Sequence, residues 1–143
     1  DGWFRTGDLG TIAPDGYVTI VGRSKDLVIT GGLNVYPREV ELVLDALPGV
    51  AESAVIGLPH PDFGEAVVAV VVPAPGTTTD PATLQAAARE RLAGYKAPKR
   101  VFVVPELPRN ALGKVRKAAL REAFRDTFVS TGLSTGLAAG DAA

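Results

Sequence analysis

The chain has 143 residues, 46% of them hydrophobic and 22% charged, with a formal net charge of −1, which is typical of one globular domain of ordinary size. It contains no cysteine and one histidine, so disulfides, thiolate zinc sites, cysteine nucleophiles and multi-histidine metal sites are excluded. No apolar run approaches the roughly 18 residues of a membrane span and no signal-peptide pattern is present, so we expect a cytoplasmic protein with no membrane partner.

The first part of the chain is predicted to form a β-hairpin and then a tight turn. The expected strands are residues 10–13 and 17–21, joined by the turn Pro14-Asp-Gly16. A short apolar segment, 27–29, then leads into a second turn, Thr30-Gly-Gly32.

A helix is predicted to begin at Pro37, because proline suits the first turn of a helix. Its apolar face is formed by Val40, Val43, Leu44 and Leu47, and Pro48-Gly49 should end it. Two strands, 51–58 and 65–73, are expected next, joined by the loop 59–64.

The second half of the chain is predicted to contain two helices and one strand. Asp80 and Pro81 cap and open the first helix, which ends before Gly94. A strand at 101–104 and a loop at 105–113 precede the final helix, expected from 115 to about 128. This order of elements predicts an α+β fold with a small mixed sheet covered by helices, followed by a disordered tail from Ser130.

The charge is distributed unevenly. Residues 1–65 carry four basic and ten acidic residues, whereas residues 89–126 carry eleven basic and four acidic ones. This polarity indicates an anionic ligand near the C-terminal half, although a solvated basic helix face gives the same pattern.

Three motifs carry the chemistry: Gly2-Trp-Phe-Arg-Thr-Gly-Asp-Leu-Gly10, Gly22-Arg-Ser-Lys-Asp-Leu-Val-Ile-Thr-Gly-Gly32 with Pro37-Arg-Glu-Val-Glu41, and Pro108-Arg-Asn-Ala-Leu-Gly-Lys-Val-Arg-Lys117. In this order they resemble the C-terminal domain of the adenylate-forming superfamily, which includes acyl-CoA synthetases, peptide-synthetase adenylation domains and luciferases. The resemblance covers residues 1 to about 126. The segments 61–65 and 95–117 look closest to malonyl-CoA and methylmalonyl-CoA synthetases.

The resemblance implies a domain organisation. Residues 1–24 would end a large N-terminal domain, with Lys25 at the hinge, and 25–128 would form a C-terminal lid, followed by the tail 129–143. The absence of methionine and the start in mid-motif likewise lead us to expect a fragment whose N-terminal domain is missing.

The resemblance also implies an ATP site. Asp8 would accept hydrogen bonds from both ribose hydroxyls, and Arg23 would hold the same ribose. A turn-capping aspartate paired with a surface arginine is the structural alternative. Mg²⁺ is expected with ATP, with its ligands in the missing domain and no metal site on this chain.

Lys114 is expected to be catalytic. A Walker-type phosphate loop is excluded, because the required glycine before Gly113 and a hydroxyl residue after Lys114 are absent. In the family, this lysine reaches the substrate carboxylate and the α-phosphate of ATP, where an ammonium acts as an electrostatic catalyst.

A site for CoA is implied as well. Gly31 and Gly32 match a glycine turn lining the pantetheine tunnel, and Phe63 and Tyr95 match aromatics that stack the adenine, with Lys99 on a phosphate. A turn that only needs positive φ, and core packing of the two aromatics, are the alternatives.

The expected function is therefore the lid of an ATP-dependent acid–CoA ligase acting on a small carboxylic acid such as malonate or methylmalonate. A lid that loads a carrier protein is the alternative within the family. Lys114 could also be acetylated by a protein lysine acetyltransferase. His60, between two prolines, is expected to be a turn residue, and a nucleic-acid-binding role is disfavoured because no recognition motif accompanies the basic residues.

Overall fold

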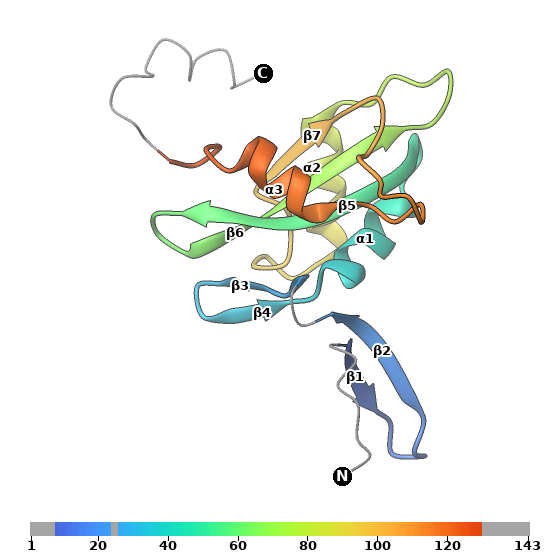
Figure 1. Ribbon diagram of the computed structural model, residues 1–143, viewed down its shortest axis with the longest axis vertical. Coiled ribbons are helices and arrows are strands. Elements are labelled where there is room, and N and C mark those ends of the chain that lie inside the picture. The colour runs from blue at the N-terminus through green and yellow to red at the C-terminus, as the bar shows by residue number, and fades with distance from the viewer. Residues whose placement is uncertain (1–7, 24–25, 130–143) are drawn as a thin grey trace.

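A β-hairpin opens the part of the chain that the computed structural model describes, which is residues 8–23 and 26–129. Strands β1 (Asp8–Ile12) and β2 (Val18–Arg23) pair antiparallel, and the hairpin projects from the rest of the molecule (Figure 1). The predicted hairpin is confirmed.

The main sheet has five strands and combines antiparallel and parallel pairs. These strands are β3 (Val28–Thr30), β4 (Leu33–Val35), β5 (Val50–His60), β6 (Gly64–Pro73) and β7 (Arg100–Val103). Their order is β4-β3-β6-β5, and β7 pairs in parallel with β6, so β5 is an edge strand. The predicted small mixed sheet is confirmed.

The short strand β4 is not predicted from the sequence. Gly31 and Gly32 have φ values of +56° and +82°, and Thr30 pairs with Leu33 across them. Two consecutive residues with positive φ form the kind of turn that reverses the chain direction in a tight hairpin. Glycine adopts this backbone conformation without strain. The predicted glycine turn therefore folds the chain back as a β3–β4 hairpin.

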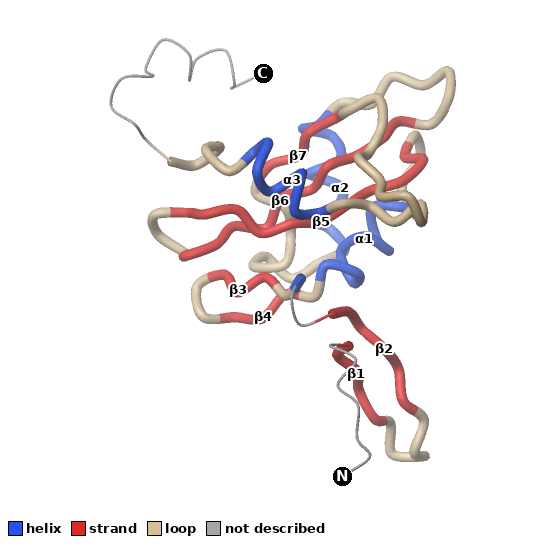
Figure 2. The backbone as a smooth tube through the Cα atoms, viewed as in Figure 1, coloured by secondary structure: helices blue, strands red, loops and turns tan. Residues whose placement is uncertain are grey.

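Helices cover both faces of the main sheet. Helices α1 (Pro37–Asp45) and α2 (Pro81–Arg91) pack on one face, and α3 (Lys117–Phe124) packs on the other (Figures 1 and 2). Alternate side chains of β6 therefore enter two different cores: Val67, Ala69 and Val71 enter the first, and Val68 and Val70 enter the second. A strand covered on both faces needs no polar alternation, which explains the continuous apolar run in the sequence.

Both of the first two helices begin where the sequence predicts. Pro37 is the first residue of α1, and Asp80 caps α2 by accepting a hydrogen bond from Thr83 N at 3.0 Å. Helix α1 ends at Asp45, however, before the predicted residue Leu47. Leu47 precedes a proline, and the proline ring disfavours helical backbone in the residue before it.

Helix α3 is shorter than predicted at both ends. Val115 pairs with Arg109 in an isolated β-bridge and Arg116 N donates to Pro108 O at 2.8 Å, so this segment is held outside the helix. At the other end, the Thr127 hydroxyl and Thr127 N both donate to Phe124 O, at 2.6 and 3.0 Å. A hydroxyl that competes for a backbone carbonyl favours a turn over continuation of the helix.

The loop predicted at 59–64 is also shorter than expected. Pro59 and His60 belong to β5, where they pair with Glu65 and Gly64. Proline is accommodated there because an edge strand leaves one row of backbone groups unpaired. The tail predicted from Ser130 lies outside the described residues.

Candidate functional site

The loop that carries Lys114 is held by its own backbone and by one asparagine. Asn110 Oδ1 accepts hydrogen bonds from Leu112 N at 2.9 Å and Lys114 N at 3.0 Å, while Asn110 N donates to Lys114 O at 2.9 Å. Gly113, at φ +83°, donates from its N–H to Asn110 O at 2.9 Å. This geometry fixes the backbone of Lys114 and leaves its side chain exposed to solvent.

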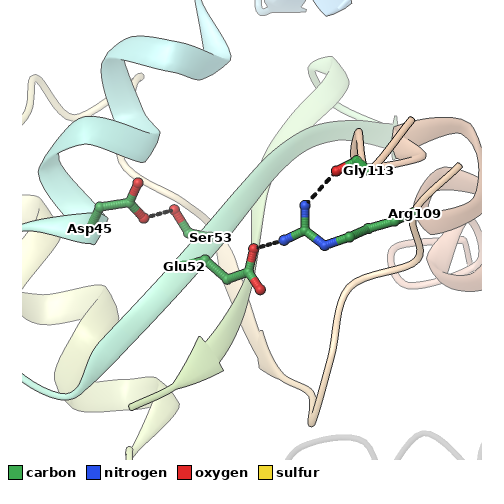
Figure 3. A network of polar contacts seen from close by, with 5 residues as sticks. All are labelled: Asp45, Glu52, Ser53, Arg109 and Gly113. Carbon is green, nitrogen blue, oxygen red and sulfur yellow. Dashed lines mark hydrogen bonds and ion pairs between the residues drawn. The ribbon is translucent and has the colours of Figure 1, made fainter. Parts of the chain in front are cut away.

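Arg109 joins this loop to the edge strand. One guanidinium nitrogen donates to Gly113 O at 2.8 Å, and the other pairs with the carboxylate of Glu52 on β5 (Figure 3). Beside them, the Ser53 hydroxyl donates to Asp45 Oδ1 of α1 at 2.7 Å. The loop before Lys114 is therefore attached to β5, and β5 to α1.

A second attachment lies just after Lys114. Lys117 Nζ is 2.8 Å from Glu41 Oε2, and the same oxygen accepts from Val55 N at 2.9 Å. Both side chains are largely buried, with 16% of Lys117 and 10% of Glu41 exposed. Because α1 and α3 cover opposite faces of the sheet, this ion pair crosses the edge of β5 and links them.

Sequence reasoning assigned no role to Glu41 or Arg109. Glu41 could have been singled out, because it occupies the same helical face as Pro37, Val40 and Leu44, all of which are buried. A carboxylate on a buried helix face needs a cationic partner. Only the fold shows which of the many basic residues is the cationic partner of Glu41.

Lys114 lines a basic pocket of about 440 Å³. Its lining residues are Asp26, Asn110, Lys114, Val115, Arg116, Lys117, Ala118 and Arg121. The predicted basic region is thus gathered in part around Lys114. A second pocket, of about 280 Å³ between β7 and α3, contains none of the predicted site residues.

Three of the residues predicted to bind CoA lie together. Gly31 N donates to Phe63 O at 2.9 Å, and Lys99 Nζ lies 4.8 Å from the centroid of the Phe63 ring. His60 stacks on the same ring with a centroid separation of 4.5 Å. His60, which we expected to be only a turn residue, therefore supports the aromatic ring of this cluster.

Tyr95 lies next to a different lysine. Lys96 Nζ is 5.7 Å from its ring centroid and also pairs with Glu39 Oε2 at 2.8 Å. The hydrogen bond to Glu39 raises the pKa of Lys96, against the opposing effect of burial. Phe63 and Tyr95 are 38% and 37% exposed, so neither is a core residue.

The residues predicted to hold the ATP ribose are described only in their backbone. Asp8 and Arg23 are paired across the hairpin at its open end, which brings two residues far apart in sequence side by side. Lys25, the predicted hinge, lies outside the described residues. The next residue, Asp26, forms an ion pair with Arg121 in α3, with Asp26 Oδ1 3.8 Å from Arg121 Nη1.

Neither a metal centre nor a membrane span is found in the described part of the chain. No group of three or more His, Cys, Asp or Glu side chains there could hold a metal ion. No helix there is long and apolar enough to cross a bilayer.

Comparison with protein families identifies one match. Residues 39–114, more than half of the chain, match the model described as the AMP-binding enzyme C-terminal domain. This range runs from within α1 to Lys114, so it includes Glu41 and most of the loop that carries Lys114.

Proteins similar in sequence to this chain include CoA ligases. A 3-[(3aS,4S,7aS)-7a-methyl-1,5-dioxo-octahydro-1H-inden-4-yl]propanoyl:CoA ligase of Rhodococcus jostii is 53% identical over 85% of this chain, and an indoleacetate–CoA ligase of Aromatoleum aromaticum is 49% identical over 85%. The crystal structure of ATP-bound MatB from Rhodopseudomonas palustris is 57% identical over 87% of this chain, with a TM-score of 0.82. The chain spans about a quarter of each relative, 24% of both ligases and 25% of MatB.

Proposed function

We propose, because this chain belongs to the AMP-binding enzyme C-terminal domain family, that it is the catalytic lid of an AMP-forming acid–CoA ligase. The observation that carries the proposal is the exposed side chain of Lys114 on a loop whose backbone is held by Asn110 and Arg109. A mobile ammonium on a fixed backbone suits a lid, because it reaches the substrates when the lid closes and leaves when it opens.

The chemistry divides into two half-reactions. In the first, a carboxylate oxygen bonds to the α-phosphorus of ATP, and the bond from that phosphorus to the bridging oxygen breaks, releasing pyrophosphate with the electron pair. In the second, the sulfur of CoA bonds to the acyl carbon, AMP leaves, and the thiol proton passes to solvent. Lys114 acts in the first step, where two anions meet and negative charge accumulates on the leaving group.

The residues that contact ATP and CoA are divided between this chain and the rest of the enzyme. Asp8 and Arg23 bind the ribose of ATP on the large-domain side of a hinge at Lys25, and residues 25–128 form the lid. Mg²⁺ accompanies ATP as a requirement of the nucleotide. Its protein ligands are proposed to lie in the large domain, since Mg²⁺ bound with a nucleotide needs only one or two carboxylates beside the phosphates.

The cluster around Phe63 is the proposed site for the CoA nucleotide. A half-exposed aromatic ring next to a lysine can stack a base and bind a phosphate. Gly31 and Gly32 line the path of the pantetheine arm, and Tyr95 contributes a second exposed aromatic ring. Loading of a carrier protein is the competing function, and the names of the relatives favour CoA.

The acid substrate is proposed to be small, with malonate or methylmalonate as the first to test. The resemblance of the segments 61–65 and 95–117 to malonyl-CoA and methylmalonyl-CoA synthetases supports this choice, whereas the Rhodococcus and Aromatoleum relatives are named for other acids. Acetylation of Lys114 by a protein lysine acetyltransferase would remove its charge while keeping its length, and so switch off the first half-reaction.

The test is a pair of assays on Lys114→Ala in the full-length enzyme. Pyrophosphate release from ATP and acid should fall by roughly 10²–10³-fold, the typical contribution of one electrostatic group in an active site. AMP release from supplied acyl-adenylate and CoA should be almost unchanged. Equal losses in both assays would assign Lys114 to folding or CoA binding and contradict the proposal.

A further inference from the structure

The segment from Lys114 to Arg116 presents two cations on one side. Val115 pairs with Arg109 in a β-bridge and packs against the core beneath α3, whereas Lys114 and Arg116 are both exposed. Alternate residues of an extended backbone point to the same side and lie about 6.6 Å apart. Lys114 and Arg116 therefore project together, and both line the same pocket.

The charges of this pocket are only partly balanced. Of its four cationic residues, Lys117 is paired with Glu41 at 2.8 Å and Arg121 lies 3.8 Å from Asp26. Among the described residues, no acidic group pairs with the side chain of Lys114 or Arg116. The pocket thus offers two neighbouring cations to an anion.

The two cations differ in what they bind best. An ammonium is a compact point charge, whereas a guanidinium donates two parallel hydrogen bonds to the oxygens of a phosphate. If Lys114 lies at the α-phosphate, Arg116 is close enough along the same segment to reach the phosphates that leave. No role for Arg116 follows from the sequence motifs.

We propose that Arg116 binds the β- and γ-phosphates of ATP and the pyrophosphate formed from them, so that Lys114 and Arg116 together hold the polyphosphate during adenylate formation. This inference rests on the proposed function of Lys114. Arg116 contributes to binding and orientation, and Lys114 to the charge at the reacting phosphorus. Because the lid carries both residues, its opening removes both cations at once and helps release pyrophosphate.

The experiment uses the reverse of the first half-reaction in the full-length enzyme, with inorganic pyrophosphate as the probe. Arg116→Ala should raise the KM for pyrophosphate at least about tenfold, as expected when a charged hydrogen-bonding partner is removed. Arg116→Lys should give an intermediate value, because it keeps the charge and loses the paired hydrogen bonds. The KM for the acid, and the rate of thioester formation from acyl-adenylate and CoA, should not change.

Arg125→Ala is the matched control. Arg125 lies just after α3, is 60% exposed, and pairs with Glu122 and Asp126, so its removal changes the net charge equally without touching the pocket. An equal rise in the pyrophosphate KM for Arg125→Ala would reduce the effect to general electrostatics and overturn the inference. An unchanged KM for Arg116→Ala, while Lys114→Ala still loses adenylate formation, would overturn the inference and leave the proposed function intact. If Lys114→Ala keeps full adenylate formation, the proposed function itself fails.

Discussion

Glu41 and Lys117 meet across the edge of β5, with Lys117 Nζ 2.8 Å from Glu41 Oε2 and Val55 N donating to the same oxygen. The pair joins helices on opposite faces of the sheet and lies directly after the loop of Lys114. The pair is therefore a charged contact that links the two helix-covered faces of the sheet next to the candidate active site.

Removing one partner of this pair should destabilise the chain strongly. We expect Glu41→Ala to lower the free energy of unfolding by about 3–5 kcal/mol, because a largely buried lysine is left without its counter-ion. The double variant Glu41→Gln, Lys117→Met should recover much of this loss, because it keeps an acceptor for Val55 N and leaves no unpaired charge. Urea unfolding of the natural chain, Glu41→Gln, Lys117→Met and the double variant measures the coupling between the two side chains, and strictly additive effects would contradict it.

The cap of α2 should make stability depend on acid pH. The Thr83 hydroxyl and then Thr83 N donate to the Asp80 carboxylate, and these bonds hold its pKa below the usual value. A carboxyl with a lowered pKa stabilises the fold above its unfolded pKa of about 3.9, and this contribution is lost as the pH falls through the lower folded pKa. The Tm difference between the natural chain and Asp80→Ala should therefore be full above about pH 4 and shrink below it.

Asp80→Asn is the control for that measurement. Asparagine caps helices about as well as aspartate but does not titrate in this range. Its Tm difference from Asp80→Ala should stay nearly constant with pH. A parallel pH dependence in both comparisons would show that other carboxyl groups cause the effect.

The proposed CoA site makes a prediction that separates the two half-reactions. Phe63→Ala should raise the KM for CoA by roughly 5- to 150-fold, the range of one lost base–aromatic stack, and leave pyrophosphate release unchanged. Lys99→Ala should act in the same direction through the lost phosphate contact. Leu42→Ala is the control, because it truncates an exposed apolar side chain outside the proposed site, on α1. Slower pyrophosphate release by Phe63→Ala would instead indicate a structural role.

The ribose role of Asp8 can be tested through ATP alone. Asp8→Ala in the full-length enzyme should weaken ATP binding by about 1–3 kcal/mol, because hydroxyl donors of the nucleotide lose their acceptor. Asp8→Asn, which keeps one carbonyl acceptor, should have a smaller effect. The ATP KM for pyrophosphate release is the measurement, and an unchanged value in both variants would exclude the role.

Local chemistry was enough to predict several elements of the fold. The hairpin turn at Pro14-Asp-Gly16, the proline that opens α1 and the Asp80 cap all act within a few residues, and each is found where predicted. The helix ends are less local. Helix α3 begins later than its apolar pattern indicates, because Val115 is held by Arg109 from the preceding strand-like segment.

The sequence by itself determined the starts of the first two helices, because each depends on residue types at short spacing. Its motifs also carry the family resemblance that singles out Lys114 as the catalytic candidate. Only the tertiary structure decided how Lys114 is held. Glu52 and Arg109 look like ordinary surface charges in the sequence, and Glu41 stands out only by its place on an apolar helix face. The charged partner of each comes from another element. Charged side chains carry no local signal of which opposite charge they will meet, since that choice depends on how two helices and an edge strand pack together.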